Sequence, residues 1–437
     1  SNIDLLKSYY KSKGYKFVSN TVIPTKYDTT SNGNAATDSN PQYVDIHLEH
    51  GLKLEKENKT VTRTINYYDQ DKKQLINDAN PKVSELQTVT QTVNFERYAI
   101  HDQVAKQIIG YATPNQVIFD DKNEAQLAQK DGYTHTTASD ARAGYAVTSK
   151  NSNFASQTNY DLSKYGYEAP TDKPTDKDGK SFAQVDEVTP LPTDGDTIVK
   201  VYYREKVVTV TVDNPPVEGQ TVPGTDAKFP ANDWSAQKAT NTSTRTIHYI
   251  YDEKTFVNGE DVSGQPVPSL KDIEQKVNFT QSAKINLVTG VVSYQGDWKA
   301  TSSSTTNQKG ETIPNKGGTS YAQVDSPSSK NGYPELKGYT PHSETVDAVE
   351  AIHGTDAGDV YVRYVANKSL VQIEYIDEDT RDVIKLDKPE GTSGEKLVYS
   401  TDSAIRDFEK QGYELVSDGF TDNDHNLNKE TFDSYDD

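Results

Sequence analysis

Apolar and polar residues alternate along much of this chain, and a period of two predicts half-buried β-strands. The clearest alternating runs are residues 43–48, 199–203, 360–364 and 370–376. The last run is followed by the polar residues 377–380 and a second apolar run at 383–386. Asp and Thr are typical turn residues, so this stretch predicts a β-hairpin.

Helical spacing occurs in a short segment near each end. Residues 3–13 carry Ile3, Leu6 and Tyr10 on one face, and Gly14 suits the position just after a helix. A strand at residues 15–18 is expected to follow.

The second helical segment carries Ala404, Ile405 and Phe408 on one face. Thr401 suits the N-cap and Gly412 the stop, and residues 413–416 are expected to form a strand. A further helical turn or two is expected at residues 124–130.

Long sequence repeats divide the chain into whole domains in series. Residues 62–67 (TRTINY) return 182 positions later as 244–249 (TRTIHY). Residues 91–95 (QTVNF) return 184 positions later as QKVNF. The alternating strands at 199–203 and 360–364 close the two copies and lie only 161 positions apart. The offset thus falls from 184 to 161, so the first copy contains an insertion, which we place within residues 110–150. A period this long exceeds the roughly 20–50 residues of solenoid repeats.

The order strand, strand, helix, strand is that of a β-grasp fold. Since residues 14–19 (GYKFVS) match residues 412–417 (GYELVS), each end holds part of such a module. The predicted fold class is therefore α+β and β-rich, an elongated string of β-grasp (ubiquitin-like) submodules with longer strand-rich ones. The predicted domains are 1–58 (the C-terminal part of a β-grasp submodule), 59–206 (a longer submodule with an insertion), 207–240 (a strand and a Pro-containing linker), 241–366 (a second longer submodule) and 367–437 (the N-terminal part of a β-grasp submodule).

Composition favours several small cores over one large core. Hydrophobic residues make up 33% of the 437 residues, with a mean hydropathy of −0.82. The formal net charge of −20 argues against binding to nucleic acid or to anionic membranes. The absence of cysteine excludes disulfides, thiol catalysis and iron–sulfur clusters. No apolar run is long enough to insert into a membrane.

The sequence lacks the common catalytic motifs, which predicts a protein that is not an enzyme. No catalytic motif built on His, Ser or a Gly-rich loop is present, and paired carboxylates are as common as the charge requires. Asp422 and Asp424 resemble the start of a calcium loop, without its Gly and terminal Glu. The sequence therefore predicts no cofactor, with calcium at these two aspartates as the alternative.

Aromatic side chains are the remaining candidates for binding. Trp298, Tyr294 and Trp234 could stack on the apolar faces of sugar rings. The alternative is that Trp298 fills a small core and Trp234 fixes the linker against its neighbour.

The repeated motifs resemble those of a known family. The longer submodule of mucus-binding (MUB-type) repeats resembles each copy in the order of its motifs. These are TRTIxY, then QxVNF, Gly-Tyr and a closing VxVxY strand. Residues 375–380 with Gly412 and Tyr413 resemble the shorter, MucBP-type submodule. Residues 289–298 fit the family pattern, whereas the first copy departs from it at residues 106–111.

This resemblance implies an extracellular adhesin, anchored to the cell wall of a Gram-positive bacterium through parts absent from this chain. Its implied partners are mucin glycoproteins or their glycans, bound through weak repeated sites, and some family members also bind immunoglobulins. The alternatives are a spacer without a binding site, an immunoglobulin-binding module and, least favoured, a wall glycan hydrolase. Because the two ends hold complementary pieces of one fold, head-to-tail self-association is a further hypothesis.

The acidic charge argues against simple attraction to sialylated or sulfated mucin. Hydrogen bonding and aromatic stacking are therefore expected to dominate, with little effect of added salt on binding.

Overall fold

A computed structural model describes residues 2–18, 43–84, 86–136, 140–170, 184–421 and 430–433. The chain forms two compact units. The first contains Ser1–Lys206 and Thr221–Lys228, and the second contains Val207–Gln220 and Phe229–Asp437. Both are strand-rich, as predicted, and the described part of the chain holds no helix long and apolar enough to cross a membrane.

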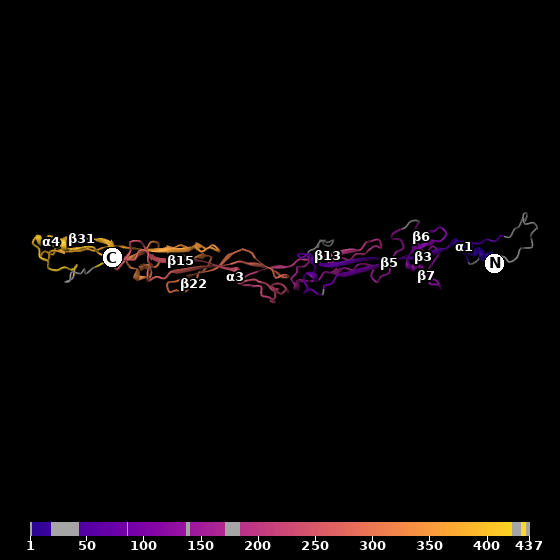
Figure 1. Cartoon of the computed structure of the whole chain (residues 1–437), viewed down its shortest axis with the longest axis horizontal. Helices are drawn as coiled ribbons and strands as arrows, with labels where there is room; N and C mark the ends of the chain where they lie inside the picture. The colour runs from indigo at the N-terminus through magenta and orange to yellow at the C-terminus, as the bar shows by residue number, and fades with distance from the viewer. Residues whose placement is uncertain are drawn as a thin grey trace, which may run out of the picture. The chain divides into compact units, whose positions relative to one another are not determined.

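The first unit is built on a pair of long strands, labelled in Figure 1. β3 (Leu52–Asp69) and β5 (Val89–Asp102) pair antiparallel from Leu52–Asp102 to Ile65–Val89. The sheet order is β13-β3-β5-β6-β9, and β13 runs parallel to β3. The other members are β4 (Gln74–Leu75), β6 (Gln107–Ala112), β9 (Thr134–His135), β10 (Ala146–Val147) and β13 (Thr197–Tyr203).

The second unit repeats this plan with β15 (Thr240–Tyr251) and β18 (Ile273–Thr280). Its sheet order is β22-β21-β18-β15-β28-β25, and β28 again runs parallel to β15. The TRTI motif and the closing VxVxY strand are thus neighbours in each unit. The other members are β21 (Lys299–Thr306), β22 (Thr312–Pro314), β25 (Tyr339–Pro341) and β28 (Gly358–Ala366).

The rest of each unit consists of small sheets and short helices. The remaining strands are β1 (Tyr15–Phe17), β2 (Leu48–His50), β7 (Val117–Phe119), β8 (Ala125–Leu127), β11 (Gln157–Thr158), β12 (Gln184–Val185), β14 (Val207–Val210), β16 (Phe256–Val257), β17 (Glu260–Asp261), β19 (Ala283–Asn286), β20 (Val292–Tyr294), β23 (Ser320–Tyr321), β24 (Val324–Asp325), β26 (Thr345–Val346), β27 (Val349–Glu350), β29 (Lys368–Leu370), β30 (Ile373–Ile376), β31 (Val383–Asp387) and β32 (Glu390–Thr392). The α-helices are α1 (Asn2–Ser12), α2 (Ile76–Ala79), α3 (Ala236–Ala239) and α4 (Asp402–Lys410), and single 3-10 turns lie at Pro114–Gln116, Ser163–Tyr165, Ser329–Asn331 and Pro334–Leu336.

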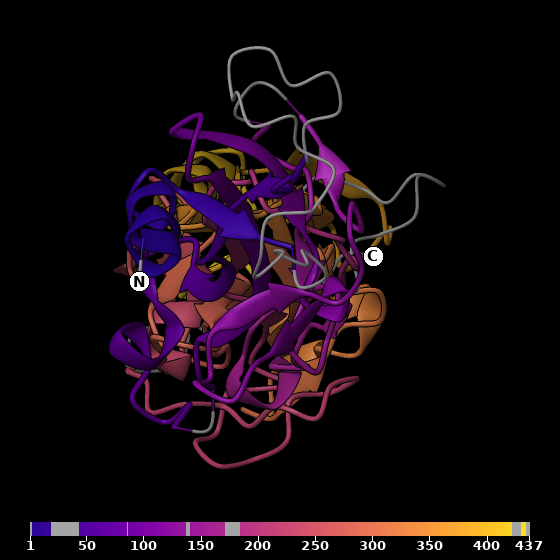
Figure 2. The ribbon, with the colours of Figure 1, turned by 90° about the vertical axis from the view of Figure 1, so that its right-hand side faces the viewer.

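The predicted helices at the ends of the chain are confirmed as α1 and α4. Figure 2 shows α1 as the indigo helix beside β1, the strand of the same colour. Gly14 and Gly412 follow the helices, both with φ of +95°. The hairpin of β30 and β31 is also confirmed. Thr401 occupies the predicted N-cap position of α4, but its side chain makes no capping hydrogen bond.

Three local predictions are wrong. Residues 43–47 form no strand, and the strand there begins only at Leu48 as β2, which pairs with β1. Residues 413–416 form no strand. The predicted helical turn at residues 124–130 is instead β8, which pairs antiparallel with β7. In each case the presence or absence of a pairing strand overrode the local pattern.

The recurring motifs hold the sheet together through one buried arginine in each unit. Arg63 Nε donates to Gln91 Oε1 (2.9 Å), and its Nη atoms donate to the carbonyls of Asp186 and Ala155. The guanidinium also lies 5.4 Å from the ring centroid of Phe154. The arginine of TRTI and the glutamine of QxVNF thus hydrogen-bond to each other, and the arginine also binds two loop carbonyls. This shared structural contact explains why the two motifs recur together.

Arg245 makes the same set of contacts in the second unit. Its Nε donates to Gln275 Oε1 (2.7 Å), and its Nη atoms donate to the carbonyls of Asp347 and Ala322. Tyr321 replaces the phenylalanine, 5.3 Å from the guanidinium. The repeat in sequence is thus a repeat in contacts.

His248 lies between two carboxylates in the second unit, where the first unit has Asn66. Its ring nitrogens lie 2.8 Å from Asp272 and 3.0 Å from Asp359, and its ring stacks on Tyr361. Burial alone lowers the pKa of His248, but the hydrogen bonds to Asp359 and Asp272 outweigh it and raise the pKa above its usual value. The protonated imidazole therefore links β15 to both neighbouring segments.

We expect His248→Asn to destabilise the second unit by about 1 kcal/mol at pH 6. Because the folded-state pKa is raised, the stabilisation is fully present below the unfolded pKa of 6.5. It is then lost as the pH rises through the folded-state pKa. Urea unfolding of both proteins from pH 5.5 to 9 tests this, and a constant difference across that range would contradict it.

Candidate functional site

The structure places the three aromatic candidates at two positions in the second unit. Trp298 is half-buried against the cluster of Val277, Phe279 and Tyr321. The imidazole of His353 stacks on the indole with ring centroids 4.3 Å apart and an interplanar angle of 15°. One face of Trp298 is therefore already occupied by a ring of the same chain.

Tyr294 and Trp234 come together through the backbone of Ser235. The Ser235 N–H donates to Tyr294 Oη (2.8 Å), and Trp234 precedes it in the chain. The indole Nε1 of Trp234 is buried and has no hydrogen-bond partner among the described residues. The contact fixes residues 234–235 against β20.

The predicted calcium candidates, Asp422 and Asp424, lie outside the described residues.

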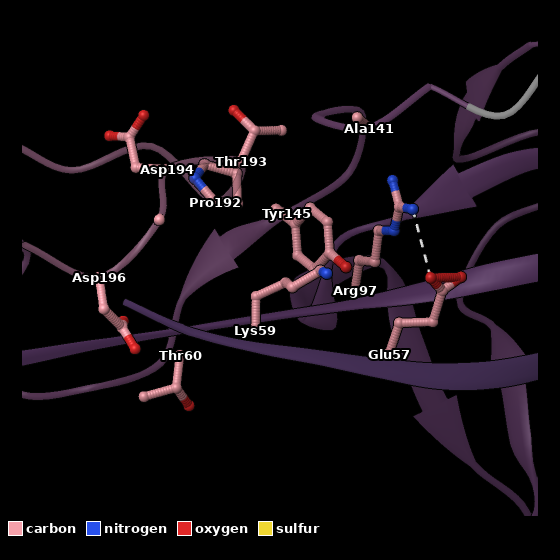
Figure 3. A pocket seen from close by; sticks show the side chains of 11 residues that line it. Glu57, Lys59, Thr60, Arg97, Ala141, Tyr145, Pro192, Thr193, Asp194 and Asp196 are labelled. Atoms are coloured by element: carbon pink, nitrogen blue, oxygen red, sulfur yellow. Dashed lines mark hydrogen bonds and ion pairs between the residues drawn. The ribbon is translucent and has the colours of Figure 1, made fainter. Parts of the chain in front are cut away.

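A groove of about 610 Å³ in the first unit is the main candidate site, and sequence reasoning did not identify it. It lies where the β3 and β5 ribbon meets two loops, as Figure 3 shows. The lining residues are Glu57, Lys59, Thr60, Arg97, Ala141, Tyr145, Pro192, Thr193, Asp194, Gly195 and Asp196. Its volume lies within the roughly 300–1,000 Å³ usual for small-ligand sites.

Arg97 forms the rigid wall of this groove. Its Nη1 donates to the carbonyls of Asp140 (2.6 Å) and Ala143 (2.9 Å), and its Nη2 donates to Glu57 (3.2 Å). The guanidinium carbon lies 4.2 Å from the Tyr145 ring centroid. Arg97 thus holds the loop around residue 140 against the sheet, and its charge is balanced by Glu57.

Tyr145 lies beside the arginine in the groove. Burial raises the pKa of the Tyr145 hydroxyl above its usual value, and the positive charge of Arg97 only partly offsets this. The hydroxyl therefore stays protonated at neutral pH and can both donate and accept hydrogen bonds.

Other polar groups of the groove are able to contact a ligand. Lys59 has no ion-pair partner within the part of the chain that the structure describes. Asp194 accepts the Leu191 N–H (2.7 Å) and Asp196 accepts the Thr62 N–H (2.8 Å), in each case through one carboxylate oxygen. An ammonium group, carboxylate oxygens and the Tyr145 ring suit a polyhydroxylated ligand such as a sugar.

The second unit lacks this set of groups. The repeat offsets place Asn241 where the first unit has Lys59, and Gln281 where it has Arg97. Asp356 accepts the Thr244 N–H as Asp196 accepts that of Thr62, but Gly354, two residues earlier, stands in place of Asp194. Gly354 N–H donates to Asn241 Oδ1 (3.1 Å). The charged groove is thus specific to the first copy.

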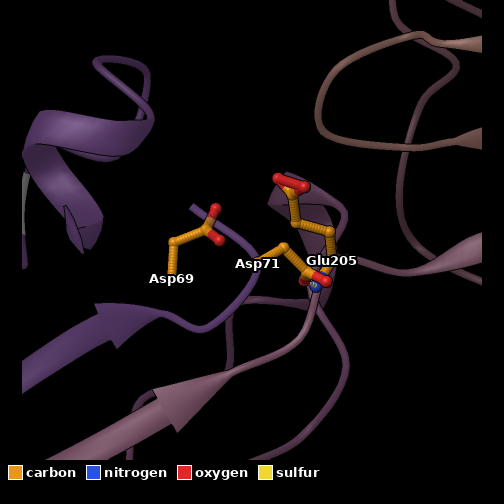
Figure 4. A group of neighbouring side chains, drawn as sticks. All are labelled: Asp69, Asp71 and Glu205. Carbon is orange, nitrogen blue, oxygen red and sulfur yellow. Dashed lines mark hydrogen bonds between the residues drawn. The ribbon is translucent and has the colours of Figure 1, made fainter. Parts of the chain in front are cut away.

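Within the part of the chain that the structure describes, Asp69, Asp71 and Glu205 form a group of carboxylates that could hold a metal ion. Figure 4 shows the three side chains. One oxygen from each lies within 4.8 Å of the others. Asp69 already accepts Tyr167 Oη–H (2.9 Å) and the Lys72 N–H, and Asp71 accepts the Glu205 N–H (2.8 Å). These bonds join the ends of β3 and β13, so the cluster has a structural role without an ion.

Comparison with known proteins identifies the C-terminal part of the chain. Residues 369–437 match the family model of a mucin binding domain, and residues 234–368 match that of a Muc B2-like domain. No curated protein matches the chain.

Several solved structures resemble parts of the chain. The crystal structure of Mub-RV is 19% identical and covers 47% of this chain and 81% of its own, with a TM-score of 0.29. The type 2 repeat of the mucus binding protein MUB from Lactobacillus reuteri is 15% identical, with a TM-score of 0.24. The match covers 70% of this chain and 100% of that structure. The mucin-binding domain of a Streptococcus pneumoniae protein is 23% identical, with a TM-score of 0.19. The match covers 29% of this chain and 91% of that structure. Over residues 234–437, the chain is thus similar to two adjoining domain families, a Muc B2-like domain and a mucin binding domain.

Proposed function

We propose that this chain is a segment of an extracellular adhesin that binds mucin glycoproteins. The observation that carries this proposal is the pair of adjoining family matches over residues 234–437, one to a Muc B2-like domain and one to a mucin binding domain. The internal repeat gives the first half of the chain the same motifs, so mucin would be contacted at several places along the chain. Weak sites in one chain then bind together by avidity.

Two further proposals concern the fold of the terminal segments and the attachment of the protein to the cell. The terminal segments, with one helix and paired strands each, are proposed to be β-grasp submodules of an elongated string. Anchoring to a Gram-positive cell wall is proposed from the resemblance to wall-anchored adhesins. The domain limits drawn from the sequence and an immunoglobulin partner also stay predictions.

The groove of the first unit is the proposed glycan site. Its polar groups can donate to and accept from sugar hydroxyls, and Tyr145 offers an aromatic ring. Since Arg97 and Glu57 neutralise each other, binding to neutral sugars would depend little on salt. Trp298, Tyr294 and Trp234 remain candidates for separate contacts in the second unit.

The test is binding of the whole chain to immobilised mucin before and after enzymatic removal of the glycans. We expect retention to fall to background once the glycans are gone. Retention that survives would indicate recognition of the protein part of mucin. No retention on intact mucin would instead support a spacer.

We expect Lys59→Ala to reduce mucin retention about threefold, because it removes one charged hydrogen-bond donor from the groove. Lys122→Ala is the matched control, since Lys122 is also exposed in the first unit but lies outside the groove. Equal retention of the two variants would show that the groove is not the glycan site.

A further inference from the structure

A second hollow lies between α1 and β1 and has a different chemistry. Its volume is about 330 Å³, and it is lined by Lys7, Ser8, Lys11, Tyr15, Lys16 and Phe17. Three of these six side chains are cationic, in a chain with a formal net charge of −20. Within residues 2–18, four lysines stand against the single carboxylate of Asp4, for a local net charge of +3.

The local fold brings the lysines to one place. Lys7 and Lys11 are four residues apart and therefore share one face of α1. The left-handed turn at Gly14 returns the chain along the helix as β1, where Lys16 lies next to Phe17. A Cβ at Gly14 would overlap the backbone of Gln103, so this turn is fixed against the rest of the first unit.

Aromatic rings form the apolar part of the hollow. Lys7 Nζ lies 5.9 Å from the Phe17 ring centroid. The rings of Tyr10 and Tyr15 meet edge to face, 5.8 Å apart, so packing holds Tyr15 in position. The hollow thus combines ammonium groups with half-buried aromatic faces.

The positive charge in this hollow is not neutralised by the chain itself. Among the described residues, none of the ammonium groups of Lys7, Lys11 and Lys16 forms an ion pair with a carboxylate. Glu49 stands opposite Lys16 in the β1–β2 register, but its carboxylate is bound to Lys130 Nζ at 3.3 Å. Like charges held together repel each other, and a bound anion would relieve that repulsion.

We infer that this hollow binds the acidic sugars of mucin, sulfated or sialylated, through Lys7, Lys11 and Lys16. Lysine ammonium groups pair with a sulfate or carboxylate, Ser8 can hydrogen-bond a hydroxyl, and Tyr15 and Phe17 can pack on the C–H face of the ring. The volume, near the lower end of the range for small-ligand sites, suits one or two sugar units. The mucin source of the sugar rests on the proposed function, whereas the preference for an acidic sugar rests on the hollow alone.

Direct titration of the whole chain with defined sugars tests the preference. The probes are 6-sulfo-N-acetyllactosamine, 3′-sialyllactose and neutral N-acetyllactosamine, with inorganic sulfate as a fourth probe. We expect the acidic sugars to perturb the NMR signals of residues 7–17, and the neutral sugar to leave them unchanged. Raising NaCl from about 0.05 to 0.5 M should weaken acidic-sugar binding several-fold, because exposed charges are screened within a few ångströms.

Lys11→Gln combined with Lys16→Gln should weaken acidic-sugar binding about tenfold, since two exposed charge contacts are lost. Lys276→Gln combined with Lys284→Gln is the matched control. It changes the net charge equally at two exposed strand positions of the second unit and should leave the affinity unchanged.

Equal weakening by the two pairs of substitutions would overturn the inference, as would equal binding of neutral and acidic sugars. Binding of inorganic sulfate as tight as that of the sulfated sugar would overturn the role assigned to the aromatic rings. The proposed function fails separately. If the chain bound acidic sugars but not intact mucin, the inferred sugar site would be supported and the proposed adhesin function would be contradicted.

Discussion

Arg245→Ala is expected to lower the free energy of unfolding of the second unit by about 3 kcal/mol. The arginine is 3% exposed, and its guanidinium donates to Gln275, Asp347 and Ala322. Alanine would leave the buried amide oxygen of Gln275 without its arginine donor, and it would remove the hydrogen bonds to the two carbonyls and the packing on Tyr321. Charged hydrogen bonds contribute roughly 1.5–3 kcal/mol, and a buried acceptor without a donor costs a further 1–3 kcal/mol.

Thermal and urea unfolding measure this effect. Arg363→Ala is the matched control, because Arg363 lies on β28 of the same sheet with an exposed side chain, and its loss should cost less than about 0.5 kcal/mol. Arg245→Lys should recover little of the lost stability, since lysine lacks the planar fork that reaches three acceptors. Similar losses for Arg245→Ala and Arg363→Ala would show that the motif arginine is not a structural anchor.

Gly394→Ala is expected to release the C-terminal segment from the domain before it, at a cost of about 3 kcal/mol. Gly394 has φ of +77°, and a Cβ there would overlap the carbonyl oxygen of Phe256 and the hydroxyl of Tyr339. The same glycine accepts the Gly259 N–H (2.8 Å) and donates to the Phe432 carbonyl (3.1 Å). A left-handed residue with a side chain costs roughly 1–2 kcal/mol, and the overlap adds to that cost.

Hydrogen exchange of residues 396–421 and 430–433 measures the release, and faster exchange there should accompany unchanged exchange in β15 and β18. Gly264→Ala is the matched control, because its φ of +72° imposes the same backbone strain while a Cβ would meet nothing within 4 Å. That variant should cost only about 1 kcal/mol. If both alanines had the same effect, close contact at Gly394 would not be what holds the segment.

The candidate binding sites show where sequence reasoning was limited. Trp298 and Trp234 were identified by residue type alone, which gives no information about what covers a side chain. The groove around Lys59 depends on loops near residues 140 and 194 that meet β3 only in the folded chain. Its one sequence signal was the departure of the first copy from the second, which marked the first copy as different without giving its chemistry.

The net charge also gave an incomplete expectation. Summed over the chain, −20 argues against attraction to acidic sugars, yet four lysines gather within residues 2–18. Charges act over about 8 Å at physiological salt, so a ligand in the hollow is attracted by the nearest lysines far more than by the chain average.

The sequence by itself determined the strand-rich class, the two copies, both terminal helices and the β30–β31 hairpin. These follow from periodicity, from repeated motifs and from turn and capping residues, which are local properties of the chain. Only the tertiary structure decided that residues 125–127 pair as a strand, that residues 43–47 do not, and that Arg63 and Arg245 each tie two strands to two loops. Pairing and burial join residues far apart in sequence, and no local pattern of side chains specifies which partner a strand or a loop will meet.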